Sequence, residues 1–360
     1  MVRRTPDPVV PGRYVGALDL TTEVPTPEGT IAVAHLQVGH TVFSGDGQVS
    51  SVSEISEPLT GHTCFEVEFA TGDRIVADDE QRWFTERRDV PRTVAAPRRR
   101  ATLELAGSVA EHGPAAFAVR VAPAVQLPTR KLLVEPYLLG AWLGTGADTL
   151  PALVGASDAL VRNLDEQGVR VFTSGLPRQH WIATPGAARR GANLASRLTA
   201  LHVLGDKHVP TLYLRASEEQ RRELLAGLLD ASGAVTHGGE VLFRAPTQAL
   251  AVGVHELIAS LGYRPWRRPG PVRGVDVGFV TADQVFGIEP LRVLHQSRRR
   301  LAARLRPRRL VVAVRPVETR PVRRIKLASD DGMLLVGRSF IPVPGATLEP
   351  YAEEDSADTA

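Results

Sequence analysis

Residues 224–235, LLAGLLDASGAV, decide the fold of this chain. The stretch is a leucine-rich helical pattern that carries small residues at Ala226, Gly227 and Ala231 and ends at Gly233. Small residues on one helix face allow a second helix to approach until the two backbones touch. A terminal glycine also suits a left-handed exit from the helix. The stretch therefore predicts one half of a close helix pair. Ser217 and Gln220, three residues apart, predict a capping box at the start of this helix.

A second copy of the pattern lies upstream at residues 138–146, LLGAWLGTG, with glycines at 140, 144 and 146. One such helix alone is typical of an ordinary leucine-rich core. Two copies with matching glycine spacing favour a helix pair at the seam of a domain with pseudo-two-fold symmetry. We expect the motif glycines to be structural, namely Gly140, Gly144, Gly146, Gly227 and Gly233.

Length and composition set the broad class. With 360 residues, 43% of them hydrophobic, the chain can form two or three domains with cores of their own. It holds no apolar run of about 18 residues, and its first residues lack the apolar segment of a signal peptide. Its single cysteine, Cys64, excludes an internal disulfide. We expect a cytoplasmic monomer without membrane association.

The basic residues are unevenly distributed. Arginines make up 40 of the 43 basic residues, and 13 basic residues lie between Arg292 and Lys326 against one acid, Glu318. The end of the chain from Glu349 to Asp358 is acidic. A charge run of this kind indicates either a solvated face or a surface for a polyanion.

The pattern of apolar and polar residues changes along the chain. Residues 1–16 are proline-rich and predict an irregular arm, whereas residues 17–126 alternate apolar and polar side chains between turn signals, which predicts an all-β unit. Residues 131–305 carry longer helical patterns with strand-like segments between them. Strand texture returns over residues 311–347, before an acidic tail at 348–360. The predicted fold is mixed, a discontinuous all-β domain with an inserted α+β domain.

Six segments resemble, in order, the sequence blocks of inteins from actinobacteria and their phages. They are ALDLTTEVPTPEG, LQVGHTVFSGDGQ, VEFATGDRIVADDEQRWFT, LGDKHVPTLYL, LGYRPW and VRPVETRPVRRIKLASDDGMLLVGRSFIPV. The resemblance covers about residues 17–347. It implies a Hint domain for protein splicing, interrupted by a homing endonuclease domain of the LAGLIDADG or DOD type, whose motifs the two leucine-rich helices resemble.

The positions that this resemblance assigns to splicing carry unreactive side chains. The first nucleophile falls on Ala17, and the histidine that assists the first acyl shift falls on Gln81. The His-Asn pair that releases the other end falls on Pro344 and Gly345. Because an acyl shift starts from a thiol or hydroxyl, we expect no splicing. Few residues lie outside these positions, so we also expect a free-standing, degenerate relative of inteins.

The metal-binding positions of the endonuclease are substituted in the same way. The resemblance places the two metal-binding acids on Thr145 and Ser232. Neutral hydroxyls are poor ligands for hard cations, so we expect neither cleavage nor a cofactor. One alternative is an active, Mg²⁺-dependent DNA endonuclease that uses Asp148 or Asp230 instead.

DNA binding is the function that these substitutions leave open. Arginine suits phosphate and guanine, and a tryptophan can stack or wedge. We expect contacts with double-stranded DNA from Lys207, His208, Arg264, Trp266, Arg267, Arg268, Arg298, Arg299 and Arg300. A structural relic, or a protein-interaction module without a nucleic-acid role, is the other alternative.

Overall fold

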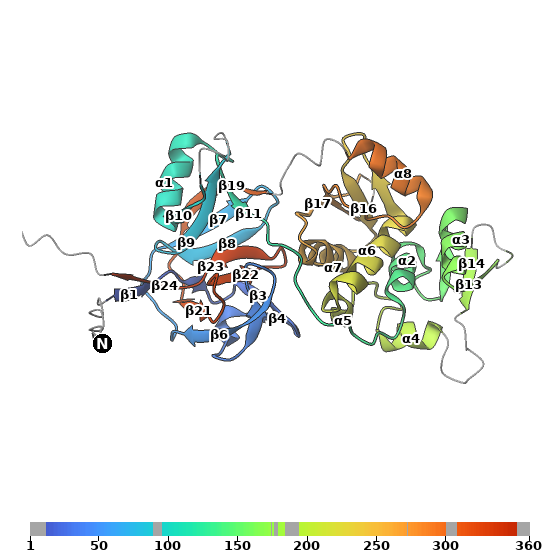
Figure 1. Ribbon diagram of the computed structural model, residues 1–360, viewed down its shortest axis with the longest axis horizontal. Coiled ribbons are helices and arrows are strands. Elements are labelled where there is room, and N and C mark those ends of the chain that lie inside the picture. The colour runs from blue at the N-terminus through green and yellow to red at the C-terminus, as the bar shows by residue number, and fades with distance from the viewer. Residues whose placement is uncertain are drawn as a thin grey trace, which may run out of the picture.

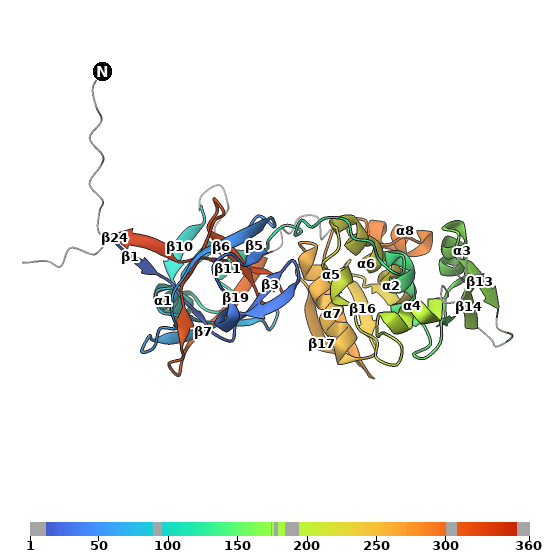
Figure 2. The same ribbon diagram turned by 90° about the horizontal axis from the view of Figure 1, so that it is seen from below.

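A computed structural model describes residues 12–88, 96–173, 175, 179–183, 194–271, 273–299 and 308–350. Figures 1 and 2 show two bodies side by side, one built mainly of strands and one rich in helices. We call them the β body and the inserted body. None of the helices in these ranges is long and apolar enough to span a membrane.

The β body contains strands from both ends of the chain. Before the insertion they are β1 (Gly12–Val15), β2 (Leu18–Asp19), β3 (Glu23–Thr26), β4 (Gly29–Ala32), β5 (Thr41–Phe43), β6 (Val49–Ile55), β7 (Cys64–Phe69), β8 (Arg74–Asp78), β9 (Arg82–Arg87), β10 (Arg98–Ala101) and β11 (Phe117–Arg120). After it they are β19 (Arg308–Val317), β20 (Val322–Arg323), β21 (Ile325–Leu327), β22 (Met333–Val336), β23 (Ile341–Pro344) and β24 (Thr347–Pro350). A 3-10 turn spans Val33–His35.

The main sheet joins these two sets of strands. Its order is β10-β9-β11-β19-β7-β8-β2-β20, so β19, which follows the insertion, lies between β11 and β7. Phe117 of β11 pairs with Val311, and Cys64 of β7 pairs with Val317. Cys64 is fully buried, as expected for a small apolar residue. The β body therefore closes only when the chain returns from the inserted body.

One helix was not expected in this unit. Residues Thr102–His112 form α1, although the sequence pattern predicted an all-β unit over residues 17–126. Leu105 and Val109, one helical turn apart, are buried, and the Trp83 indole donates to the Thr102 hydroxyl at 3.0 Å. This spacing of four residues is a helical signal that the surrounding alternation concealed.

The inserted body combines helices with two small antiparallel sheets. Its helices are α2 (Pro136–Thr145), α3 (Asp158–Glu166), α4 (Leu194–Ala200), α5 (Thr211–Leu214), α6 (Glu218–Ser232), α7 (Gln248–Ser260) and α8 (Glu289–Arg298). Its strands are β12 (Ala152–Val154), β13 (Arg170–Thr173), β14 (Gln179–Ala183), β15 (Gly233–Val235), β16 (Val241–Ala245), β17 (Trp266–Pro269) and β18 (Val275–Phe279). The sheets have the orders β12-β14-β13 and β15-β16-β18-β17.

The helices α2 and α6 touch through their glycines, as the spacing predicted. A methyl group on Gly140 would overlap the Leu224 carbonyl oxygen, and one on Gly227 would overlap the Tyr137 carbonyl oxygen. A methyl group on Gly144 would lie 2.6 Å from the Ala231 Cβ atom. Only a residue without a side chain permits such an approach.

The predicted left-handed helix exit is wrong at both motif ends. Gly146 has φ −61° and Gly233 has φ −83°, which any residue can adopt. Glycine is needed at these positions for space. A methyl group there would overlap the carbonyl oxygen of the preceding turn, from Trp142 in α2 and from Leu229 in α6. Ser217 begins α6 with the predicted capping box, because Ser217 and Gln220 exchange hydrogen bonds.

Buried polar contacts join the two bodies. The Arg215 guanidinium of the inserted body donates to the Thr26 and Gly29 carbonyls of the β body, at 2.7 and 2.8 Å, and pairs with Glu256 at 2.8 Å. Nearby, His255 of α7 contacts the Ser339 hydroxyl at 2.7 Å. We call these residues the interbody latch. Because they are buried, losing one partner would leave a polar group unpaired.

The glycine contact makes a stability prediction. We expect Gly140→Ala to lower the free energy of unfolding by about 1–3 kcal/mol or more, because the new methyl group meets backbone that cannot yield. Gly107→Ala is the matched control, since an added methyl on this α1 residue meets nothing within 4 Å. It should stabilise by about 0.5–1 kcal/mol. Urea unfolding followed by circular dichroism measures both, and equal stability of Gly140→Ala and the wild type would contradict the packing argument.

Candidate functional site

The first candidate site surrounds Ala17, at the start of β2. Its backbone N–H donates to the Asp78 carboxylate at 3.0 Å, and the His62 ring contacts the other Asp78 oxygen at 3.2 Å. Burial raises the pKa of Asp78, and the contacts with Ala17 and His62 act against that rise. The Ala17 methyl group packs against Cys64 and Val322. The carboxylate therefore orients this backbone segment, and Ala17 itself offers no nucleophile.

Gln81 connects the beginning and the end of the β body. Its Nε2 atom donates to the Pro344 carbonyl at 2.7 Å and to the Arg82 carbonyl at 2.9 Å. Its Oε1 atom lies against Gly16, where an added Cβ atom would be only 3.0 Å away. The cavity between these groups measures about 10 Å³, roughly the space of one water molecule. One buried side chain thus fills the place where the two segments meet.

The segments on either side of this place pair with each other. Strands β1 and β24 form an antiparallel ribbon in which Val15 pairs with Thr347, and Figures 1 and 2 show it on the side of the β body away from the inserted body. Gly345 N–H donates to the Gly332 carbonyl at 2.7 Å. The bonds Gly16–Ala17 and Gly345–Ala346 therefore lie at one end of a closed ribbon.

The second candidate site lies where α2 and α6 end. The Thr145 hydroxyl donates to the Ala141 carbonyl at 3.1 Å, and the Ser232 hydroxyl donates to the Gly144 carbonyl at 2.8 Å. The Asp148 side chain is 76% exposed, with its carboxylate 3.5 Å from the Lys207 ammonium. In the described residues, no group of three or more His, Cys, Asp or Glu side chains could hold a metal ion.

Asp230 points into the protein core. It accepts hydrogen bonds from the Tyr137 hydroxyl at 2.7 Å and from the Gly287 and Ile288 backbone N–H groups at 2.9 and 3.0 Å. Burial raises the pKa of Asp230 to about 6, although these donors favour its charged form. The carboxylate thereby holds the turn that leads into α8. Its oxygens are engaged in structural contacts.

Lys207 is buried beside the end of α2. Its ammonium donates to the Gly146 carbonyl at 2.5 Å and lies 5.1 Å from the centre of the Trp142 ring. Burial lowers the pKa of Lys207. A cation at this position meets the negative end of the helix dipole. The side chain is only 6% exposed, so its ammonium faces the protein.

The structure brings only some of the other predicted DNA-contact residues together. Trp266 and Arg268 lie on the outer face of β17, with the Arg268 guanidinium 4.3 Å from the Trp266 ring centre, and Arg267 between them is exposed. The Trp266 indole donates to Glu240 at 2.6 Å. The sequence reasoning missed Arg244 of β16, which shares this face and pairs with Asp276 at 2.8 Å. The signal in the sequence was the position of Arg244 on the polar side of the alternating segment VLFRA.

The remaining predicted DNA-contact residues in the described ranges contact backbone carbonyls. Arg264 donates to Arg308 at 2.6 Å, Arg298 to Val235 at 2.6 Å and Arg299 to Ala282 at 2.5 Å. The His208 ring contacts the Asp206 carbonyl at 2.8 Å. Arg300 lies outside the described residues.

Comparisons with known proteins add to this picture. No family model matches the chain. The replicative DNA helicase DnaB of Mycobacterium intracellulare is 36% identical over 365 residues, which cover 92% of this chain and 59% of that protein. The same helicase of Mycobacterium leprae is 38% identical over 69 residues, 19% of this chain and 11% of that protein. The chain thus spans less than two thirds of these relatives.

Several solved structures with similarity to the chain are inteins. The zinc-bound Msm DnaB1 intein splicing domain has 12% identity and a TM-score of 0.31, covering 91% of this chain and all of its own. The MchDnaB-1 intein has 13% identity and a TM-score of 0.31 over the same shares. The gp41-1 intein has 30% identity and a TM-score of 0.19, covering 20% of this chain and 54% of its own. Over most of its own length, the chain is thus similar in sequence to a mycobacterial DnaB protein.

The structure brings together predicted site residues that are far apart in sequence. Ala17, Gln81, Pro344 and Gly345 line one small cavity. Ser232 reaches the backbone next to Thr145, through the Gly144 carbonyl. Asp78 and His62 had not been singled out, because an acid at a strand end and a loop histidine are common surface residues in a sequence. Their significance comes from the contact of Asp78 with Ala17 and the contact of His62 with Asp78.

The buried carboxylate of Asp230 makes a pH prediction. An aspartate with a pKa near 3.9 in the unfolded chain and about 6 in the folded one binds more protons when folded. Stability should therefore fall as the pH rises from about 4 to about 6, by up to roughly 3 kcal/mol, and stay constant above. Asp230→Asn should remove this component, because an amide can accept from Gly287 and Ile288 without becoming charged. Urea unfolding between pH 4 and 7 measures it, and a constant difference between variant and wild type would exclude the shift.

Proposed function

We propose that this intein-like chain is a DNA-binding protein that has lost both splicing and DNA cleavage. The proposal rests on the hydrogen bonds that the side chains make at the ends of α2 and α6. The hydroxyls of Thr145 and Ser232 are committed to backbone carbonyls, and Asp230 is committed to the turn before α8. Phosphodiester hydrolysis by this type of site requires anionic oxygen ligands at that place.

The loss of splicing is supported by the site around Ala17. Intein splicing starts with attack by a side-chain thiol or hydroxyl on the carbonyl of the preceding residue, which on the proposed assignment is Gly16. Ala17 has neither group, and Gln81 can donate a hydrogen bond to a carbonyl but cannot transfer a proton to a leaving nitrogen. Groups of this kind act as a unit, so losing all of them removes the reaction rather than slowing it slightly.

DNA binding is supported by the outer face of the sheet β15-β16-β18-β17. Arg244 and Arg268 lie on that face around the largely buried Asp276 carboxylate, and Trp266 lies beside Arg268. Two guanidinium groups and an indole on a sheet face suit a phosphate backbone with adjacent bases. The LAGLIDADG resemblance implies the same use of these strands.

The active endonuclease is the second candidate. It needs a metal ligand from Asp148, whose side chain is exposed near the end of α2. Lys207, whose ammonium lies 3.5 Å from that carboxylate, already supplies a cation there. This competition argues against metal binding, and we rank the candidate second.

The first prediction of the proposal concerns the polypeptide itself. We expect the purified chain to keep its full mass after overnight incubation with dithiothreitol, because no thioester can form at Ala17. The variant Ala17→Cys with Gln81→His is the positive control, since it restores a thiol beside Gly16 and a proton donor. Intact mass spectrometry measures both. Release of residues 1–16 or 346–360 from the wild type would overturn the assignment of the junctions.

The second prediction concerns DNA. We expect salt-sensitive binding to a duplex of mixed sequence and no cleavage with Mg²⁺ or Mn²⁺. Each phosphate contact contributes roughly −0.9 to the slope of log K against log salt, so Arg244→Gln with Arg268→Gln should flatten the slope by about 2. Trp266→Ala should weaken binding with little change in slope.

The matched control for this experiment is Arg74→Gln with Arg315→Gln. These exposed arginines pair with Glu68 on another part of the β body, and their loss changes the net charge equally. Fluorescence anisotropy across a salt series gives the slopes, and gel analysis of the same samples reports cleavage. If the wild type does not bind below about 100 mM salt, where counterion release favours binding most, DNA binding is refuted.

A further inference from the structure

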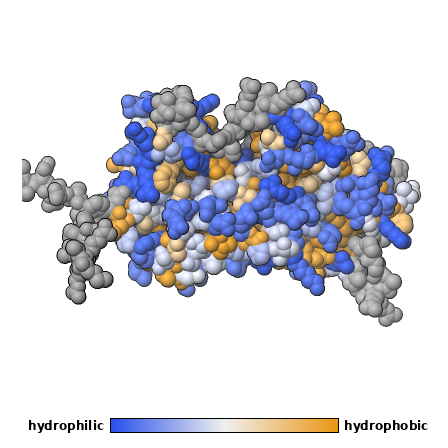
Figure 3. Space-filling model, viewed as in Figure 1, coloured by the Kyte–Doolittle hydropathy of each residue, from blue (hydrophilic) through white to orange (hydrophobic). Residues whose placement is uncertain are grey.

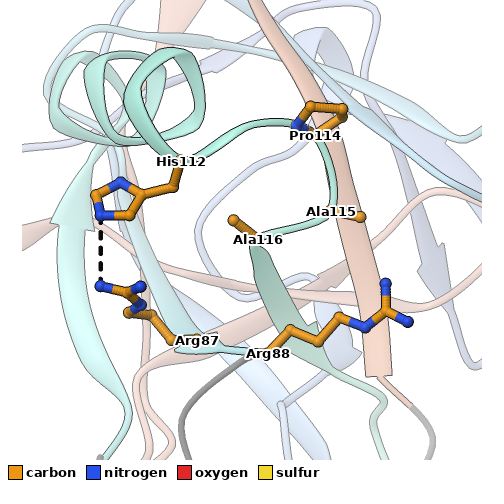
Figure 4. Close-up of a pocket in the computed structure, with 6 residues that line it drawn as sticks. All are labelled: Arg87, Arg88, His112, Pro114, Ala115 and Ala116. Atoms are coloured by element: carbon orange, nitrogen blue, oxygen red, sulfur yellow. Dashed lines mark hydrogen bonds between the residues drawn. The ribbon is translucent and has the colours of Figure 1, made fainter.

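An open, basic pocket lies on the β body, away from both sites described above. Its volume is about 330 Å³, and its walls come from β9, the end of α1 and the turn before β11, namely Arg87, Arg88, His112, Pro114, Ala115 and Ala116. Figure 4 shows the Arg87 side chain turned toward His112 and the Arg88 side chain extending the other way. The pocket is large enough for a phosphate group and its ester substituents.

Hydrogen bonds fix the His112 side of this pocket. The His112 Nδ1 atom lies 3.0 Å from the Ser108 carbonyl, so it carries the proton, and Nε2 faces Arg87 Nη1 at 3.3 Å as an acceptor. The ring also packs edge-on against Phe117, with 5.8 Å between centres. The imidazole ring therefore holds the Arg87 guanidinium at the pocket wall.

The adjacent edge strand β10 continues the positive charge. It reads Arg98, Arg99, Arg100, and the first two are exposed. The Arg99 guanidinium lies 4.8 Å from the Phe84 ring centre, and Arg100 donates to the Thr85 hydroxyl at 2.6 Å. Aromatic contacts and a strand backbone place these cations with little freedom to lose on binding.

Part of this charge has no acidic partner in the described residues, although a Glu111 oxygen lies 3.6 Å from the His112 Nδ1 atom. In the part of the chain that the structure describes, Arg88, Arg98 and Arg99 form no ion pair. Burial lowers the pKa of Arg100, and the like charges of Arg98 and Arg87 lower it further. Of the nearby acids, Glu104 caps the backbone of Ala101 at 2.9 Å. Figure 3 shows hydrophilic residues over this region of the molecule.

We infer that these residues form a second phosphate-binding surface, which contacts the backbone of the same duplex DNA outside the inserted body. We call it the β10 surface and define it by Arg87, Arg88, Arg98, Arg99 and His112. Because side chains alternate along a strand, Arg87 and Arg98 lie on one face of the sheet edge, and Arg88 and Arg99 lie on the other (Figure 4). The inference rests on the proposed function in one respect, the choice of duplex DNA as the polyanion. Phosphate contacts of this kind fix register and orientation without reading sequence.

A short path of contacts connects the β10 surface with the inserted body. Arg264, just before β17, donates to the Arg308 carbonyl at 2.6 Å, and the Arg308 guanidinium pairs at 3.2 Å with Glu86 of β9. In Figure 1, α1, β9 and β10 lie in the upper part of the β body, and β16, β17 and α8 lie in the upper part of the inserted body. On this inference, one duplex lies along this edge and meets both surfaces.

Arginines on an edge strand can also serve only to prevent association with another molecule. An unpaired edge can recruit a strand from another molecule, and charged side chains prevent it. This alternative predicts that loss of the arginines promotes self-association and leaves DNA binding unchanged. The two uses therefore give opposite results in one experiment.

The test compares Arg98→Gln with Arg99→Gln against the wild type, using a fluorescein-labelled duplex of mixed sequence. Both side chains are exposed, so the fold should persist, and thermal unfolding checks this. We expect the slope of log K against log salt to flatten by about 2, and binding at 50 mM salt to weaken. Arg74→Gln with Arg315→Gln, which carries the same charge change, should keep the wild-type slope.

The outcomes separate this inference from the proposed function. If only Arg244→Gln with Arg268→Gln flattens the slope, the inserted body binds DNA and the β10 surface does not. If only Arg98→Gln with Arg99→Gln flattens it, the β10 surface binds and the proposed role of β16 and β17 fails. If Arg98→Gln with Arg99→Gln leaves the salt slope unchanged and forms dimers in analytical ultracentrifugation, the arginines prevent strand pairing between molecules. That result overturns the inference. A wild type that does not bind overturns both.

Discussion

The backbone contact between α2 and α6 is the constraint on which the inserted body depends. The two helices approach so closely that Gly140 and Gly227 each face a carbonyl oxygen of the other helix with no space for a methyl group. This contact brings the helix ends together and fixes the sheets that follow them, because β15 begins at Gly233, directly after α6. The geometry of the helix-end site and of the arginine-bearing sheet face is therefore set by the absence of side chains at the seam.

The interbody latch extends this rigidity to the β body. The Ser339 hydroxyl lies between the His255 ring at 2.7 Å and the Asp73 carboxylate at 2.5 Å, and Arg309 pairs with Asp73 at 3.2 Å. Desolvation lowers the pKa of His255 to about 3, so the ring stays neutral at physiological pH. The latch is thus a hydrogen-bonded contact that does not change its charge between about pH 5 and 8. It holds the arginines of β17 and those of β10 in one arrangement.

Much of the fold could be predicted from local patterns, because those patterns have a local physical cause. Glycine spacing predicted the α2–α6 contact, and Ser217 with Gln220 predicted the start of α6. The contacts between distant residues could not be predicted, since nothing in the sequence connects Gln81 with Pro344 or His255 with Ser339. The same limit applied to Lys207, which looked like a surface cation in the turn GDKHVP. Only the fold shows that its ammonium is buried beside Trp142.

On the proposed assignment, the residues at the substituted positions make structural contacts. The proposed loss of splicing and cleavage is therefore hard to reverse. A side chain at Gly345 would start 2.8 Å from the Ile325 carbonyl oxygen, so an asparagine there requires the backbone to move. An aspartate at Ser232 would place a carboxylate near the Gly144 carbonyl, which now accepts a hydrogen bond from the serine at 2.8 Å. Like partial charges at that distance repel unless a cation lies between them. On the proposed assignment, splicing or cleavage therefore needs coordinated changes in the neighbouring backbone, whereas the proposed binding of a polyanion by exposed arginines needs none of them.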